Sequence, residues 1–243
     1  MVTDELITAA ENLRDNVEKL GIMLEKEGLI DCVYNPLIYA WEPHKAFIEL
    51  GGGKGAKTLL LGMNPGPHGM GQMGIPFSAT SVVRDLLGIK GLKVGKPRNQ
   101  HPKRPISGLD WHKEEVSGTR IWNLLEEHYG GVEEIFSNVF IVNHCPLMLF
   151  NGERATNITP DKISGKIVSQ LLAICDEHLI QVVKIMGINK VIAVGKYAEK
   201  RAKNALTSLN VEITSCWHPS PASPLANRNK GEDWKENVRN VLP

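Results

Sequence analysis

The sequence predicts an α/β protein with a short parallel sheet covered by helices on both faces. Four short, mostly apolar runs predict strands, and amphipathic helical patterns lie between them. Strands that alternate with helices form parallel sheets of this kind. No linker-like stretch divides the chain, so we expect residues 1–243 to form a single three-layer α/β/α domain.

The strand candidates differ in strength. Thr58–Gly62 is the best, because it is a short apolar run that ends in glycine. Residues 140–143 and 190–195 have the same character, which is typical of strands buried on both faces. Residues 211–215 are a weaker candidate, because apolar and polar side chains alternate there.

The helical patterns begin near the N-terminus. Residues 3–27 have apolar side chains at helical spacing and predict an amphipathic helix packed on the domain. Prolines at positions 36 and 43 predict an irregular stretch after it, and the glycines of 51–55 predict a flexible turn. Further helices are expected over residues 81–87, 118–129, 161–186 and 198–208.

Composition restricts the class of protein. Hydrophobic residues make up 42% and charged residues 23% of the chain, as in globular proteins, and the net charge is +1. A polyanionic ligand would therefore bind to a local basic patch. The four cysteines form no CxxC pair or zinc-type spacing, so we expect buried thiols in a reducing compartment. We find no secretory signal and no apolar run long enough to cross a membrane.

Unusual residues follow three of the four predicted strands. The clusters are residues 63–67 after the first strand, 143–146 after the second and 218–221 after the last. In open parallel sheets, ligands bind outside the carboxyl ends of the strands. We therefore expect the three clusters to meet at one rim of the sheet.

Each cluster holds one side chain that suits a ligand. Asn64 can bond a water or a sugar, Asn143 can read a ring edge with a donor beside an acceptor, and His218 can stabilise growing negative charge. Taken singly, each also has a structural interpretation: a local cap, an amide bonded to nearby backbone, or a bonded histidine. No glycine-rich phosphate fingerprint or acidic metal cluster is present, which disfavours a nucleotide-phosphate enzyme.

Together the motifs resemble those of single-strand-selective monofunctional uracil-DNA glycosylases. The resemblance rests on residues 62–67 (GMNPGP), 76–77 (PF), 143–147 (NHCPL) and 218–221 (HPSP). It extends through 35–37 (NPL), 40–44 (AWEPH), 101–105 (HPKRP) and 115–118 (EVSG), nearly the whole chain beyond the first helix. Similarity over so many segments is far more specific than one short motif.

The resemblance implies cleavage of the bond between uracil and deoxyribose, without a metal or other cofactor. It implies that Asn64 positions the attacking water and that Phe77 stacks on the flipped base. Asn143 would read the Watson–Crick edge of uracil, and His218 would support charge developing at O2. Backbone N–H groups around Met63 would add to this electrostatic cradle.

The resemblance also bears on the range of bases. Gly66 leaves space near the 5-position of the ring, which implies tolerance of 5-hydroxymethyluracil. The sequence departs from the family at His68, where vertebrate members carry Phe, and at Ala222, where they commonly carry Arg. The first change alters the mouth of the pocket, and the second removes a cation from the loop after His218.

DNA contact requires positive charge and a wedge. Six basic residues and no acidic residue lie between positions 90 and 104, a composition that suits phosphates. Within this run we expect Lys103 and Arg104 to contact DNA. The loop after His218 should carry the wedge, and its expected DNA-binding residues are Pro219, Ser220, Pro221, Leu225 and Arg228.

Two alternatives remain within DNA binding. The first is a related glycosylase that acts mainly on the deaminated purines xanthine and hypoxanthine. The second is a DNA-binding module without catalysis, although the combination of pocket residues argues against it. The expected partner is DNA with uracil or other deaminated or oxidised bases. We expect a monomer that binds no membrane and is cytoplasmic and nucleoid-associated in a bacterium or nuclear in a eukaryote.

Overall fold

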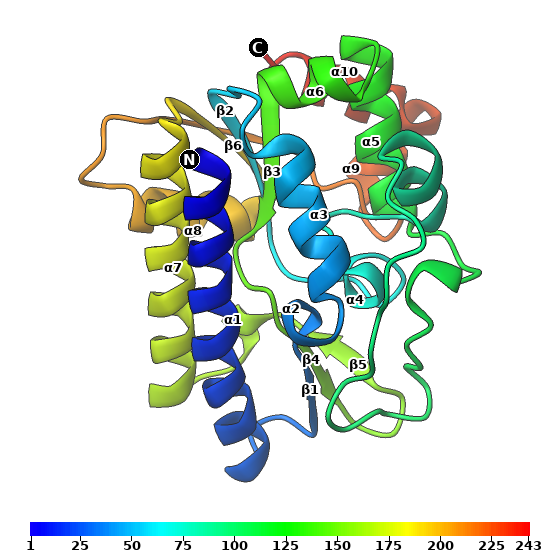
Figure 1. Cartoon of the computed structure of the whole chain (residues 1–243), viewed down its shortest axis with the longest axis vertical. Coiled ribbons are helices and arrows are strands. Elements are labelled where there is room, and N and C mark those ends of the chain that lie inside the picture. Colours follow the sequence, from blue (N-terminus) through cyan, green and yellow to red (C-terminus); the bar gives the residue numbers. More distant parts are fainter.

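A four-stranded parallel sheet forms the centre of the protein (Figure 1). The computed structural model describes residues 1–243. The strands lie in the order β3-β2-β6-β7. They are β2 (Thr58–Gly62), β3 (Val139–Asn143), β6 (Lys190–Val194) and β7 (Glu212–Cys216). All four predicted strands are therefore confirmed, with shifts of one residue at some ends.

The register of the sheet brings the carboxyl ends of all four strands to one edge. Gly62 at the end of β2 pairs with Asn143 at the end of β3, and Val194 of β6 pairs with Cys216 of β7. Every residue of β2 is buried, since its neighbours are β3 and β6 and helices cover both faces. β7 lies at the edge and is only partly buried, which explains its alternating sequence.

Helices cover both faces of the sheet. Helices α1 (Val2–Lys26) and α7 (Lys166–Met186) lie side by side on the left of the sheet in Figure 1, and α8 (Lys196–Ala205) packs against α7. Helices α5 (Val116–Tyr129) and α6 (Val132–Asn138) lie on the right. The three-layer α/β/α arrangement is thus confirmed. The helix predicted over 161–186 is divided: a 3₁₀ turn at Pro160–Lys162 precedes α7.

A second, antiparallel sheet was not predicted. It has the order β1-β4-β5 and consists of β1 (Cys32–Tyr34), β4 (Met148–Asn151) and β5 (Thr156–Ile158). Each strand is too short to show a clear periodicity. β4 begins soon after β3 ends, so this sheet lies next to the carboxyl ends of the parallel strands.

The irregular stretch predicted around Pro36 and Pro43 is wrong. Asn35 caps the short helix α2 (Pro36–Tyr39) by accepting the Leu37 N–H, and α3 (Trp41–Gly51) follows directly. Pro43 lies in the first turn of α3, where a backbone N–H has no partner within the helix, so proline costs little there. The glycine run begins as the end of α3: a Cβ on Gly51 would lie 2.4 Å from the Phe136 ring.

Short elements complete the fold. Residues 81–87 form a π-helical turn, Val82–Leu86, in place of the predicted α-helix. The remaining helices are α4 (Met70–Met73), a 3₁₀ turn at Gly108–Asp110, α9 (Pro224–Asn227), a 3₁₀ turn at Arg228–Gly231 and α10 (Glu232–Arg239). All four cysteines are buried and unpaired, as expected. No helix is both long and apolar enough to cross a membrane.

Candidate active site

A cavity of about 210 Å³ opens at the carboxyl ends of the parallel strands. The loops after β2 and β7 and the last residue of β3, Asn143, contribute to it, so residues of the three predicted clusters do meet at one rim. Seven predicted site residues line it: Met63, Asn64, Gly66, Phe77, Asn143, His218 and Ser220. The other lining residues are Pro65, Pro67, Met70, Glu115, Ser117 and Asn157.

Asn143 forms the floor of the cavity. It is 9% exposed, and its Nδ2 donates to the Met70 thioether at 3.1 Å, a weak acceptor that a better one can displace. Its register partner Gly62 makes room for it: a Cβ on Gly62 would lie 2.1 Å from Asn143 Oδ1 and 2.5 Å from the Phe77 ring. Glycine at position 62 therefore allows the amide and the ring to occupy one pocket.

Phe77 forms a wall. Its backbone has φ +51°, a left-handed conformation that costs a bulky residue about 1–3 kcal/mol. Helix α5 reaches this backbone closely at Gly118, where a Cβ would lie 2.2 Å from the Phe77 carbonyl oxygen. The ring centroid lies 6.3 Å from that of His218. The Phe77 ring therefore faces the cavity from a strained backbone, which the packing of α5 holds in place.

His218 faces the cavity from the loop after β7. Burial lowers the pKa of its imidazole below the usual value, so the neutral form is favoured. Its Nδ1 accepts the Ser220 N–H at 3.1 Å. In the neutral ring the proton must then be on Nε2. His218 therefore offers one N–H donor without carrying a charge.

Asn64 has one committed and one free polar atom. Its Nδ2 donates to the Leu147 carbonyl at 3.5 Å, the long limit of a hydrogen bond. Its Oδ1 is buried and has no partner in the protein. An unpaired buried acceptor is costly, and such atoms are often found where a protein must bind a donor.

Glu115 and Asn157 are pocket residues that the sequence analysis missed. Glu115 precedes α5, and Asn157 comes from β5 and donates to the Pro65 carbonyl at 3.3 Å. Burial raises the pKa of the Glu115 carboxyl, against the backbone N–H groups of Ser117 and His68, which lower it. Glu115 stands in the EVSG motif and could have been found from it; Asn157, on a short unpredicted strand, left no such signal.

Glu115 also corrects the interpretation of Gly66. The space beside Gly66 is not open, because a Cβ there would lie 2.7 Å from Glu115 Oε2. At Gly69 a Cβ would lie 3.1 Å from Glu115 Cγ. The two glycines therefore accommodate this side chain, and its carboxyl forms the wall of the pocket at Gly66.

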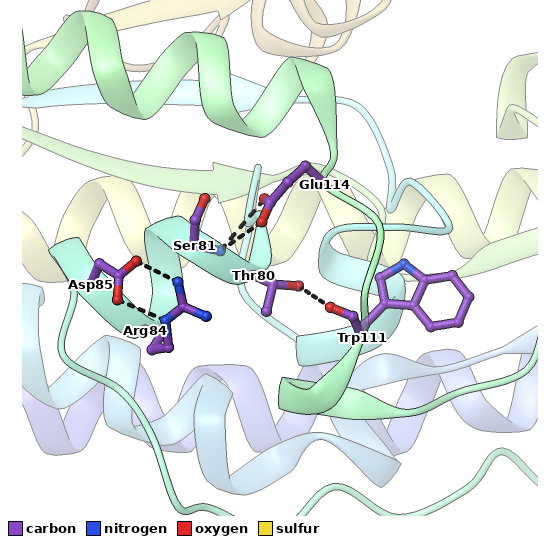
Figure 2. Close-up of polar contacts among 6 residues, drawn as sticks. All are labelled: Thr80, Ser81, Arg84, Asp85, Trp111 and Glu114. Atoms are coloured by element: carbon purple, nitrogen blue, oxygen red, sulfur yellow. Dashed lines mark hydrogen bonds and ion pairs between the residues drawn. The ribbon is translucent and has the colours of Figure 1, made fainter.

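Hydrogen bonds hold both the segment before Glu115 and the neighbouring residue His68. Figure 2 shows the segment 111–114 bonded to the turn before it: Thr80 Oγ1 donates to the Trp111 carbonyl at 2.8 Å, and the Ser81 N–H donates to the Glu114 carboxylate at 3.1 Å. On the other side, Trp111 Nε1 donates to His68 Nδ1 at 3.2 Å, and the two rings stack. His68 is thus held by an aromatic contact with Trp111, next to the loop that lines the cavity.

The predicted DNA-binding residues lie outside the cavity, apart from Ser220. Lys103 is exposed, whereas Arg104 donates to the Ala155 carbonyl at 2.9 Å and 3.1 Å and lies over the Phe150 ring. In the same basic run, Arg98 pairs with Glu25 at 2.6 Å. Part of the run therefore holds the fold together.

The loop after His218 is held by one arginine of α5. Arg120 donates to the Pro219 carbonyl at 2.9 Å and to Asn227 Oδ1 at 3.0 Å. Asn227 in turn donates to the carbonyl oxygens of the same loop, among them that of Pro221 at 2.7 Å. Pro219 is buried beneath this network, and Pro221 and Ala222 are exposed above it.

Helix α9 and the 3₁₀ turn after it carry an apolar and a basic side chain. Leu225 is 40% exposed. Arg228 is also exposed, and its Nε lies 3.4 Å from the Asp233 carboxylate. An exposed apolar and an exposed basic side chain therefore lie next to the anchored loop.

Comparison with known proteins defines the class. A family model described as "Uracil DNA glycosylase superfamily" matches residues 50–242. Wild-type SMUG2 from Pedobacter heparinus has the same fold, with a TM-score of 0.61 at 18% identity over 86% of this chain and 84% of that chain. The chain therefore belongs to the uracil-DNA glycosylase superfamily.

Curated relatives define the branch within it. The single-strand selective monofunctional uracil DNA glycosylase of Bos taurus is 43% identical over 220 residues, which cover 90% of this chain and 79% of the relative. The protein of the same name from Rattus norvegicus is 42% identical over 96% of this chain and 81% of its own length. Within the superfamily, the chain is of this single-strand-selective monofunctional type.

Proposed function

We propose that the protein hydrolyses the N-glycosidic bond of uracil in single- and double-stranded DNA, the first step of base excision repair. The observation that carries the proposal is the convergence of Asn143, Phe77 and the neutral His218 on one cavity. A ring reader, a stacking face and an uncharged donor are what recognition and release of a pyrimidine require. The metal-free chemistry expected of the family needs no further group.

The base must first leave the helix. A base inside a duplex is out of reach of the cavity, and flipping it out costs a few kcal/mol. In a single strand the pairing part of that cost is absent. Leu225, exposed on α9, fills the gap that the flipped base leaves in a duplex, and Arg228 and Lys103 contact phosphates.

Release of the base creates negative charge on uracil. The glycosidic bond breaks before water is fully bonded, giving a cation-like sugar and an anionic base. His218 donates its Nε2 proton as a hydrogen bond to O2 of the departing base, and backbone N–H groups near Met63 add to the cradle. One donor placed in this way lowers the activation barrier by about 2.7–4 kcal/mol.

Water attacks the sugar from the side of Asn64. The unpaired Oδ1 of Asn64 accepts a hydrogen bond from the water and orients it. An amide is a very weak base, so Asn64 positions the nucleophile more than it deprotonates it. This is enough for a sugar that already carries positive charge.

Asn143 excludes cytosine. Its Nδ2 donates to O4 of uracil and its Oδ1 accepts from N3–H, once the contact to Met70 is given up. Cytosine presents a donor and an acceptor in the reverse order. Because the amide is buried, the mismatched groups would remain unpaired, which discriminates strongly.

The range extends beyond uracil. 5-Hydroxymethyluracil keeps the edge that Asn143 reads and is a second substrate, and the partner of the protein is DNA with such deaminated or oxidised bases. The protein works as a monomer in the compartment that holds the DNA, the nucleoid or the nucleus.

The test is single-turnover base release without added metal. Single-stranded and duplex oligonucleotides would carry uracil, 5-hydroxymethyluracil, xanthine, hypoxanthine or thymine. Fast release of uracil and 5-hydroxymethyluracil with thymine left intact is expected. Preferential release of xanthine or hypoxanthine would mean that deaminated purines are the main substrates. Release of no base from any substrate would contradict the proposal.

A further inference from the structure

Two amide oxygens in the wall of the cavity have no hydrogen-bond partner in the protein. They are Oδ1 of Asn64, on the loop after β2, and Oδ1 of Asn157, on β5. Both residues line the cavity. In the proposed function, on which this inference rests, the first oxygen orients the attacking water and the second has no role. A buried acceptor without a partner is costly, so the second oxygen also requires an explanation.

The two amides are neighbours, because the segments that carry them are bonded to each other. Asn157 Nδ2 donates to the carbonyl of Pro65, the residue after Asn64, at 3.3 Å. Asn64 Nδ2 donates to the carbonyl of Leu147, the residue before β4, at 3.5 Å. β4 pairs with β5, and Asn157 is the register partner of Phe150. The two amides thus join the loop after β2 to the antiparallel sheet.

The bond to Pro65 determines which end of the Asn157 amide is free. A carbonyl oxygen only accepts hydrogen bonds, so the NH2 group of Asn157 must face Pro65. The amide oxygen then points away from Pro65 and has no partner. Asn157 can therefore accept a hydrogen bond in the cavity without giving up the contact that holds it.

The DNA substrate has no donor for this oxygen. A uracil nucleotide within a strand has one N–H group, at N3, and Asn143 takes it in the proposed function. The sugar and phosphate oxygens within the strand carry no proton. A donor for Asn157 must then come from water. One water molecule has two O–H groups, which equals the number of unpaired amide oxygens in the cavity.

We propose that Asn157 is a further catalytic residue, which holds the attacking water together with Asn64. Each amide oxygen accepts one O–H group, so a lone pair of the water oxygen is free to face C1′ of the sugar. The oxygen bonds C1′ as uracil leaves with the electron pair of the bond between C1′ and N1. The proton that the water loses ends on the uracil anion. One acceptor alone would leave the water free to rotate about its single hydrogen bond.

The test measures single-turnover release of uracil from single-stranded DNA by the wild type, Asn157→Ala and Asn157→Asp. Thermal melting would show that each variant folds. Affinity would be titrated with an oligonucleotide that contains 2′-fluoro-2′-deoxyuridine, which resists cleavage. Asn151→Ala is the matched control on the same hairpin, since Asn151 Oδ1 accepts the Asp31 N–H outside the cavity. It should leave the rate constant and the affinity unchanged.

For Asn157→Ala we expect the rate constant to fall by about tenfold or more, with nearly unchanged affinity for DNA. Asn157→Asp keeps an acceptor for the water, although its carboxylate cannot donate to Pro65, so at neutral pH it should be faster than Asn157→Ala. Combining Asn64→Ala with Asn157→Ala should slow release by less than the product of the two separate losses, since both oxygens act on one water.

An unchanged rate constant in a folded Asn157→Ala variant would overturn the inference. Equal rates for Asn157→Asp and Asn157→Ala would also overturn it, because the bond to Pro65 would then be the only role of the side chain. Losses that multiply in the double variant would show that the two oxygens do not share a water. In each case an active wild type would leave the proposed function standing, whereas a wild type that releases no uracil would overturn both.

Discussion

The floor of the pocket and the loop after His218 are held in different ways. The floor, Gly62 and Asn143, belongs to two paired strands, and a single added Cβ at Gly62 would collide with the amide. The loop is held by side chains that reach across, chiefly Arg120 and Asn227. Main-chain pairing fixes the amide that we propose to read the base, whereas side-chain hydrogen bonds fix the loop that we propose to contact DNA. Substitutions should therefore abolish activity at the floor and tune it at the loop.

The largest effect is expected at the floor. Asn143→Ala removes both groups that read the ring edge and should slow uracil release by about a thousandfold or more, with DNA binding nearly intact. Single-turnover release and a DNA-binding titration would measure the two effects. Asn138→Ala, on an exposed amide before the same strand, is the control. Uracil release close to the wild-type rate would show that Asn143 does not read the base.

His218 lies where floor and loop meet. His218→Ala removes one neutral donor and should slow the chemical step by about 10²–10³-fold. Single-turnover kinetics with saturating enzyme isolate that step from binding. His128→Ala, on the exposed end of α5, should have no effect. A rate constant equal to that of the wild type would rule out the charge-stabilising role.

Arg120 anchors the loop without lining the cavity. Arg120→Ala frees the loop and should reduce release from duplex DNA by about fivefold, with a smaller loss on single strands, where no wedge is needed. The ratio of the two rate constants is the measurement. Arg239→Ala breaks only an exposed pair with Glu127 and serves as control. An equal loss on both substrates would mean that the loop supports the pocket and not the wedge.

The smallest effect on the rate is expected from His44, a buried histidine that does not line the cavity. Burial lowers the pKa of His44 to about 4, and its Nδ1–H donates to the Gly74 carbonyl at 2.7 Å. Below pH 6.5 the unfolded chain binds a proton that the folded chain refuses, so stability falls as the pH drops towards 4. His44 alone should cost about 3 kcal/mol over that range.

Urea unfolding at several pH values would measure this loss. His44→Gln keeps a donor for Gly74 without the titration and should make the loss of stability at low pH smaller, by about the 3 kcal/mol assigned to His44, with uracil release at neutral pH unchanged. An equally steep dependence in the variant would place the titration on another group.

The parallel sheet could be predicted because each central strand is a short apolar run buried on both faces. β1, β4 and β5 could not, since three or four residues show no periodicity and their pairing depends on distant partners. Pro43 misled the prediction for a related reason. A proline breaks the interior of a helix but not its first turn, and the sequence does not mark where the turn begins.

The residues of the candidate site also differ in whether the sequence could predict them. Asn64, Asn143 and His218 follow strands and could be predicted from the rule that ligands bind at strand ends. Glu115 and Asn157 enter the pocket from a helix start and from the second sheet, and only the tertiary structure brings them there. Arg104 shows the converse: its charge suggested phosphate binding, while its contacts with Ala155 and Phe150 are internal.

The left-handed backbone of Phe77 has a consequence for engineering. A residue without a β-carbon would adopt φ +51° without strain, so Phe77→Gly relieves local strain at the expense of the ring. A selection for heat resistance that ignores activity could accept such a change wherever relief exceeds lost packing. At position 77, changes that raise stability are therefore expected to lower activity. A library of variants designed for thermostability should keep Phe77 unchanged.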